Sequence, residues 1–128
     1  MTTDTRNTRT TRPDAALRWA GRIVFVTAIV VITDLALQPG YVTPPRLFGS
    51  DKLEHFAAFA GLMVVARIGW PRRMWSAALA LFLYGLAIEL LQALPAIGRT
   101  ASIADLAADT VGIAAGAGAA WLATKALR

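Results

Sequence analysis

Residues 77–83 read AALALFL and residues 113–122 read IAAGAGAAWL, and neither run contains a charged side chain. A helix on the surface of a soluble bundle carries a polar stripe along its length, and both runs lack one. Helices that are apolar on every side are either buried or cross a membrane. We therefore predict an all-α, four-helix transmembrane bundle rather than a soluble four-helix bundle.

The composition supports a membrane protein and excludes several kinds of site. Hydrophobic residues make up 56% of the 128 positions, above the roughly 45–50% that is usual for soluble domains. Cysteine is absent from the sequence, which excludes a disulfide framework, a thiol nucleophile and a zinc–thiolate site. The net charge is +5, but the basic residues gather at the ends of apolar segments, so we expect no nucleic-acid partner.

Four apolar segments are separated by helix breakers. The segments cover residues 18–38, 52–70, 74–94 and 103–124. Each is close to the roughly 20 residues that cross a hydrocarbon core of about 30 Å. The breakers between them are Pro39-Gly40 with Pro44-Pro45, then Pro71, then Pro95 and Gly98. We predict a four-span membrane domain over residues 18–128, preceded by a disordered basic tail over residues 1–17.

Lysine and arginine are unevenly distributed around these segments. With the amino terminus inside, the inner segments hold Arg6, Arg9, Arg12, Arg18, Arg22, Arg67, Arg72, Arg73, Lys125 and Arg128. The outer segments hold only Arg46, Lys52 and Arg99. Cytoplasmic connections are enriched in Lys and Arg, so we predict that both termini are cytoplasmic. A cleaved signal peptide is the alternative for residues 18–38, but no small-x-small cleavage site follows that run.

Polar and ionisable residues lie at the segment ends that face the predicted outer side. At 1.5 Å per residue, His55 lies about 6 Å inside the second segment, and Glu89 and Asp109 lie about 9–10 Å inside theirs. Ionisable groups at such depth are costly in a membrane and mark a functional site. We predict a ligand-binding or functional polar cluster made of Asp51, Lys52, His55, Glu89, Gln92, Arg99, Ser102, Asp105 and Asp109. Asp34, near the outer end of the first segment, is a further candidate.

The spacing of these residues indicates which helix faces meet. Three pairs are three or four residues apart and so share a helix face: Asp51 with His55, Glu89 with Gln92, and Asp105 with Asp109. On the last segment the same face continues as Gly112 and Gly116. A small-xxx-small surface permits close helix packing, so we expect the polar pairs and the glycines to face the bundle interior.

Some of these residues also have a purely structural interpretation. Ser102-x-x-Asp105 has the pattern of a capping box, and Asp51-x-x-Glu54 has a similar one. A capping box needs nothing beyond the start of a helix. Arg99 could likewise serve only the connection in which it lies.

Glu89 is interpreted as a functional residue, whereas His55 is interpreted as a structural one. Glu89 lies inside an apolar segment where no cap explains it, so we expect it to pair with Arg99, Lys52 or His55. His55 is the single histidine of the chain, and we expect a hydrogen-bonded packing residue rather than a metal ligand. We accordingly predict no metal and no other cofactor.

Three stretches of the sequence resemble the VanZ-like membrane proteins. They read DKLEHFAAFAGL at residues 51–62, YGLAIELLQ at residues 84–92 and GRTASIADLAADTVGIAAG at residues 98–116. The positions that match the family's motifs are Asp51, Lys52, His55, Phe59, Glu89, Gln92, Arg99, Ser102, Asp105 and Gly112. Asp109 departs from the pattern, since the family usually has Asn there, and it adds a negative charge to the cluster.

The resemblance implies a small four-helix protein of the bacterial plasma (inner) membrane and cell envelope. The family is named after a member associated with low-level resistance to the glycopeptide teicoplanin. No enzymatic activity is attached to the family as a whole. The resemblance therefore implies the cellular location of the protein but assigns no reaction to it.

The cluster leaves several functions open. In the first, basic groups at headgroup level bind an anionic lipid, a lipid-linked wall precursor or a lipoglycopeptide. In the alternative, the protein is a membrane-lipid-modifying enzyme in which His55 works with Glu89 or Asp105 as general acid and base. Three further alternatives stay open. The protein could be an ion-coupled carrier, or the cluster could serve only to hold the helices together. The chain could also form an oligomer through Gly112 and Gly116.

Overall fold

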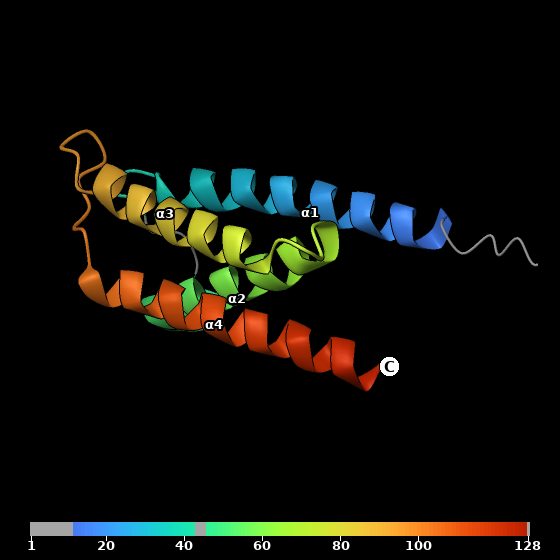
Figure 1. Cartoon of the computed structure of the whole chain (residues 1–128). Helices are drawn as coiled ribbons and strands as arrows, with labels where there is room; N and C mark the ends of the chain where they lie inside the picture. Colours follow the sequence, from blue (N-terminus) through green and yellow to red (C-terminus); the bar gives the residue numbers. More distant parts are fainter. Residues whose placement is uncertain (1–11, 43–45, 128) are drawn as a thin grey trace, which may run out of the picture.

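The structure is a computed structural model that describes residues 12–42 and 46–127 (Figure 1). Within these ranges the chain forms four helices and no strand, which confirms the predicted all-α architecture. The helices are α1 (Arg12–Ala36), α2 (Asp51–Gly69), α3 (Met74–Gln92) and α4 (Ile103–Ala126). Three of them, α1, α3 and α4, are long and apolar enough to cross a membrane.

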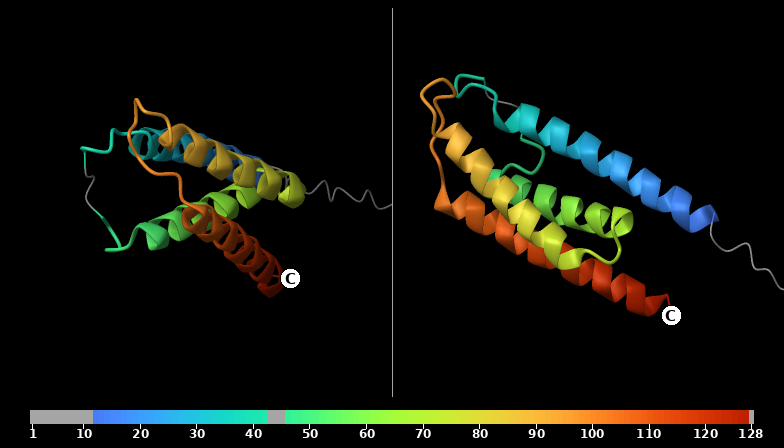
Figure 2. Two further views of the ribbon diagram at one scale, coloured as in Figure 1. Left: turned by 90° about the vertical axis from the view of Figure 1, so that its left-hand side faces the viewer. Right: turned by 45° about the horizontal axis from the view of Figure 1, so that its top comes forward.

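Helix α2 differs from the predicted second span. It is 19 residues long but carries Asp51, Lys52 and Glu54 near its start and Arg67 near its end, so it lacks the apolar composition of the other three. The described parts of α1, α3 and α4 all contact α2, whereas α1 and α4 do not contact each other. Helices α2 and α3 lie between α1 and α4 (Figure 2). The charged residues of α2 lie near its two ends, whereas its middle contributes Phe59, Leu62 and Met63 to the hydrophobic core.

Helix α1 begins earlier than the sequence predicts. Residues 12–17 are helical, so the predicted disordered tail was wrong for that stretch, while residues 1–11 lie outside the described residues. Hydropathy locates the apolar part of a helix and not its first turn. Pro13 suits the first turn because its missing N–H would have no partner there. Asp14 suits it because a carboxylate stabilises the positive end of the helix dipole.

Close packing of α2 against α4 depends on the two glycines that the sequence singled out. A Cβ atom added to Gly112 would lie 2.5 Å from the main-chain oxygen of Phe56. A Cβ on Gly116 would meet the main-chain oxygen of Ala60. Both glycines are buried. The predicted small-residue surface is therefore used within the chain, between α2 and α4.

The far end of α2 is fastened to α1. Arg22 Nε donates a hydrogen bond to the main-chain oxygen of Gly69 at 3.1 Å. The Arg22 guanidinium also lies 5.1 Å from the ring centre of Trp19 and 5.4 Å from that of Trp70. Cation–π contacts of this kind add to the attachment.

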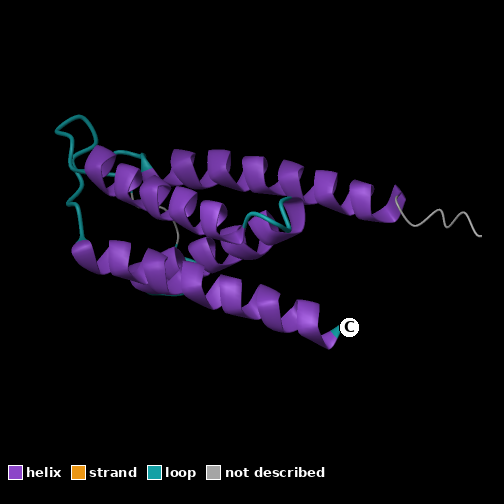
Figure 3. Cartoon of the chain, in the orientation of Figure 1, coloured by secondary structure: helices purple, strands orange, loops and turns teal. Residues whose placement is uncertain are grey.

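At the opposite end of the bundle, α1 and α3 finish and α2 and α4 begin (left in Figure 1). We call this the cluster end. The α1–α2 and α3–α4 connections both lie there, and only the short α2–α3 connection lies at the other end (Figure 3). The up-and-down order of the helices therefore brings the three motif stretches to one place.

Candidate functional site

A polar cavity of about 290 Å³ opens at the cluster end. Among its lining residues are five that the sequence predicts as site residues: Asp51, His55, Gln92, Arg99 and Asp105. They come from α2, α3, α4 and the α3–α4 connection. The remaining members of the predicted cluster lie behind this cavity or at its edge.

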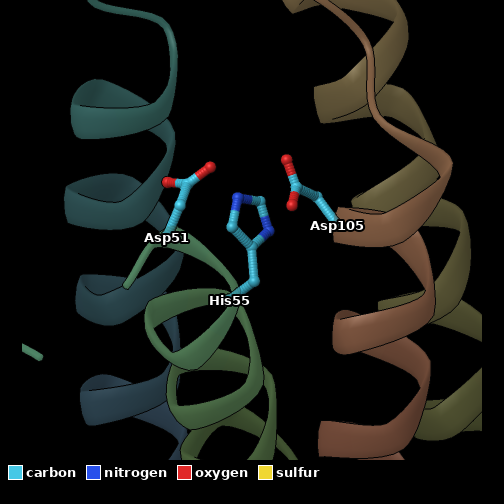
Figure 4. A group of neighbouring side chains, drawn as sticks. All are labelled: Asp51, His55 and Asp105. Atoms are coloured by element: carbon cyan, nitrogen blue, oxygen red, sulfur yellow. The ribbon is translucent and has the colours of Figure 1, made fainter. Parts of the chain in front are cut away.

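His55 is oriented by a buried carboxylate. Its Nδ1 lies 2.8 Å from Oδ1 of Asp109, and the side chain of Asp109 is only 1% exposed. An ionised carboxylate only accepts hydrogen bonds, so Nδ1 carries the proton in this pair. In the neutral form of the imidazole, the other ring nitrogen, Nε2, then carries the lone pair. Figure 4 shows the imidazole between the carboxylates of Asp51 and Asp105.

Gly85 of α3 makes room for this pair. A Cβ on Gly85 would lie 2.7 Å from Oδ2 of Asp109 and 3.2 Å from the ring of Phe59. Gly85 therefore lets α3 pass close to the buried carboxylate. Gly85 is not among the residues that the sequence predicts for the site, although a glycine inside a helix is a costly choice that indicates a close approach.

The capping box at the start of α4 is formed by three residues rather than two. Ser102 Oγ accepts a hydrogen bond from the main-chain N–H of Asp105 at 3.2 Å, as the sequence predicts. In a simple capping box the Asp105 side chain would accept from the N–H of Ser102 in return. Here that N–H donates to Oε2 of Glu89 at 2.6 Å. Glu89 of α3 thus completes the cap, and the Asp105 carboxylate is left to face the cavity.

This geometry also corrects the expected partner of Glu89. We expected an ion pair with Arg99, Lys52 or His55, and the described residues contain none between Glu89 and these groups. The side chain is buried, with Glu89 4% exposed. The main-chain donor at the start of α4 lies closer and offers the same stabilisation as a cap.

Two buried carboxylate oxygens have no hydrogen-bond donor among the described residues: Glu89 Oε1 and Asp105 Oδ1. The nearest cation to Asp105 is Lys52, whose Nζ lies 3.7 Å from Oδ1. The Lys52 side chain is 61% exposed, so it lies at the edge of the cavity rather than in it. Buried carboxylate oxygens normally accept hydrogen bonds or bind a cation.

Gln92 and Arg99 fasten the end of α1. Gln92 Nε2 and one Arg99 Nη donate to the main-chain oxygen of Ala36, at 2.8 Å and 3.2 Å respectively. Ala36 is the last residue of α1, where carbonyl groups lack helical partners. The guanidinium has five N–H donors, so it keeps donors for an occupant of the cavity.

Two glycines in the loops complete the wall of the cavity. Gly40 N donates to the oxygen of Ile97 at 2.8 Å, and a Cβ on Gly40 would lie 2.5 Å from the oxygen of Gly98. Gly98 has a φ of +65°, in the left-handed region that favours glycine. The sequence identified both glycines only as helix breakers. Thr100, another lining residue, gave no sequence signal.

Asp34 does not join the cluster. It is exposed on α1 and lines a separate, shallow groove with Thr33 and Leu37. The side chain of Thr33 forms a hydrogen bond with Tyr84, with 2.8 Å between Thr33 Oγ1 and the Tyr84 hydroxyl oxygen. The groove is lined by α1 and the residues that follow it, and it shares no lining residue with the cavity.

Comparison with known proteins identifies one family. A sequence model of the VanZ/LLP1 family matches residues 4–124, and this range includes all three motif stretches. No curated protein and no solved structure matches the chain. The match confirms the family that the motifs indicate.

Proposed function

Because the chain belongs to the VanZ/LLP1 family, we propose that it is a multi-pass protein of the bacterial plasma membrane whose cavity binds an anionic headgroup. In this proposal both termini are cytoplasmic and the cluster end faces outward. The occupant is the headgroup of an anionic lipid or lipid-linked wall precursor, or the polar part of a lipoglycopeptide such as teicoplanin. The three helices of membrane-spanning length support a cavity at headgroup depth.

The observation that carries the proposal is the position of Arg99. Arg99 lines the polar cavity. Among the described residues, its guanidinium donates one hydrogen bond, to the main-chain oxygen of Ala36. A planar guanidinium matches the geometry of phosphate and carboxylate groups. Lys52 at the cavity edge adds positive charge that attracts an anion.

Binding to defined amphiphiles tests this function. Native mass spectrometry of the detergent-solubilised protein would compare phosphatidylglycerol, undecaprenyl phosphate and teicoplanin with phosphatidylcholine as the neutral control. We expect Arg99→Ala to weaken binding of the preferred anionic molecule by about tenfold or more, because hydrogen bonds to charged groups contribute about 1.5–3 kcal/mol. Arg72→Ala is the matched control, since Arg72 is exposed at the opposite end of the bundle. Equal binding by wild type and Arg99→Ala would refute the proposal.

The enzyme alternative gains support from one observation. His55 is oriented by Asp109 at 2.8 Å, an arrangement that suits a general base. The partner is then Asp109, instead of the Glu89 or Asp105 that the sequence suggested. Lipid products would be followed over time with the purified protein: turnover that is lost in His55→Gln and retained in Asp34→Asn would favour the enzyme.

A further inference from the structure

We propose that His55, Asp51 and Asp105 bind a divalent first-row transition-metal ion at the cluster end. Each residue offers one ligand atom, and these atoms all lie within 4.8 Å of one another. Ligands of one zinc ion, at about 2.0–2.2 Å from the metal, lie roughly 3.4 Å apart in a tetrahedral site. The imidazole of His55 lies between the two carboxylates, which flank it from either side (Figure 4).

Asp105 supplies an observation that is independent of this spacing. The residue is 7% exposed, it lines the cavity, and its Oδ1 is enclosed without a hydrogen-bond donor among the described residues. The usual donor, the N–H of Ser102, is taken by Glu89. The nearest cation is the mostly exposed Lys52 ammonium at 3.7 Å, beyond hydrogen-bond distance, so this buried oxygen can still accept a closer cation.

The environment of His55 gives a second independent observation. A histidine that binds a metal almost always donates its other ring N–H to a carboxylate or carbonyl, which fixes the tautomer and the ring orientation. His55 Nδ1 makes this contact with Asp109 at 2.8 Å. Nε2 is then the free ligand atom, and Asp109 is the residue that positions it. The unusual Asp at position 109 thus gains a role as the orienting carboxylate.

The ligand set indicates the class of metal. One imidazole with two carboxylates suits first-row ions such as Zn²⁺, Co²⁺ and Mn²⁺. Mg²⁺ and Ca²⁺ prefer oxygen ligands alone. Three protein ligands leave a coordination position open, as in zinc sites that bind water or substrate. With the proposed anionic headgroup as occupant, an oxygen in this open position would lie in the same cavity as Arg99.

Lys52 competes with the ion. Its ammonium lies 3.7 Å from Asp105 Oδ1, and its side chain is 61% exposed, so it can move into solvent when a cation binds. Removing this charge in Lys52→Ala should strengthen metal binding severalfold. The same substitution should weaken binding of an anionic headgroup, so the two effects are distinguishable.

Titration of the full-length protein with metal alone tests the site. The protein, purified in detergent and freed of metal by a chelator, would be titrated with Zn²⁺ by calorimetry and with Co²⁺ by visible absorption. Mg²⁺ and Ca²⁺ serve as comparison ions. We expect one Zn²⁺ or Co²⁺ per chain, with affinity lowered at least tenfold in His55→Gln and in Asp51→Asn. In Asp109→Asn we expect a loss of about 10–100-fold, as for other orienting carboxylates.

Controls separate binding from folding. Asp51 is only half-buried at the start of α2, so Asp51→Asn keeps the fold, which circular dichroism would verify. Asp34→Asn removes an exposed carboxylate outside the cluster and should bind metal as wild type does. The site is refuted when wild type binds no stoichiometric metal, or when Asp51→Asn and His55→Gln bind as tightly as wild type. Because no headgroup is present in the titration, its outcome is independent of the proposed function.

Discussion

The main-chain N–H of Ser102 donates to Glu89 Oε2 at 2.6 Å, so a side chain of α3 caps the first turn of α4. This bond connects two helices that are joined by a mostly exposed ten-residue connection, residues 93–102. It also determines where the Asp105 carboxylate points, since that group would otherwise accept the same hydrogen bond. The arrangement of the cavity therefore depends on a residue that does not line it.

Replacing Glu89 should destabilise the protein in proportion to the loss of this bond. In Glu89→Ala the Ser102 N–H loses its acceptor, and we expect the free energy of unfolding to fall by about 1–3 kcal/mol. In Glu89→Gln the amide oxygen still accepts the bond, so the loss should be smaller. Thermal unfolding in detergent measures both, with Glu54→Gln, a half-buried acid on α2, as the control. Equal melting temperatures for Glu89→Ala and wild type would contradict the capping role.

The glycines between α2 and α4 should tolerate no added methyl group. Gly116→Ala places a Cβ against the main chain of α2, and overpacking of this kind costs about 1–3 kcal/mol. Gly118→Ala is the matched control on the same helix, because nothing lies within 4 Å of a Cβ there. We expect a lower melting temperature for the first variant only. If both variants melt together, the close approach of the two helices is not a determinant of stability.

Gly85→Ala should disturb the orientation of His55 without touching it. The new methyl group would lie 2.7 Å from Asp109 Oδ2, so the carboxylate must shift and the His55–Asp109 bond must lengthen. We expect weaker Zn²⁺ binding, by about tenfold or more, as when an orienting carboxylate is lost. Calorimetry with Gly61→Ala as the control checks this, because a Cβ on Gly61 meets nothing within 4 Å. Unchanged Zn²⁺ affinity in Gly85→Ala would show that Asp109 does not orient the imidazole.

Metal binding should weaken as the pH falls. The imidazole must be neutral and the carboxylates ionised to act as ligands, so protons compete with the ion. Affinity should therefore be lost on going from about pH 7.5 to about pH 5.5, and the ion should release protons when it binds at the lower pH. Co²⁺ absorption measured across this range detects the effect. An affinity that does not change with pH would exclude His55 as a ligand.

The sequence predicts the position of the site better than its internal contacts. Apolar runs and helix breakers locate the helices. The polar residues that share one depth in the sequence include Asp51, His55, Gln92, Arg99 and Asp105, which line one cavity in the structure. Spacing along a helix shows which residues share a face, but not which neighbouring helix that face meets. For this reason the partners that the structure gives to buried acids differ from those expected.

Two features of the fold depend on tertiary packing and could not be predicted from sequence patterns. Helix α2 contacts each of the other helices, and its charges lie near its two ends, although hydropathy alone counts these charges against a span. The contact between Gly40 and Gly98 joins two loops that are distant in sequence. A glycine that follows a helix has the same sequence pattern whether it only ends the helix or also packs against another loop.

The carbonyl group of Ala36 receives hydrogen bonds from both Gln92 and Arg99. The Arg99 guanidinium keeps further N–H donors beside this contact, so an anion bound to it would be connected through Arg99 to the end of α1. We therefore expect an occupant of the cavity to change the mobility of the last turn of the first helix. A fluorophore attached near Leu37 would report the filling of the cavity as a change in the motion of α1.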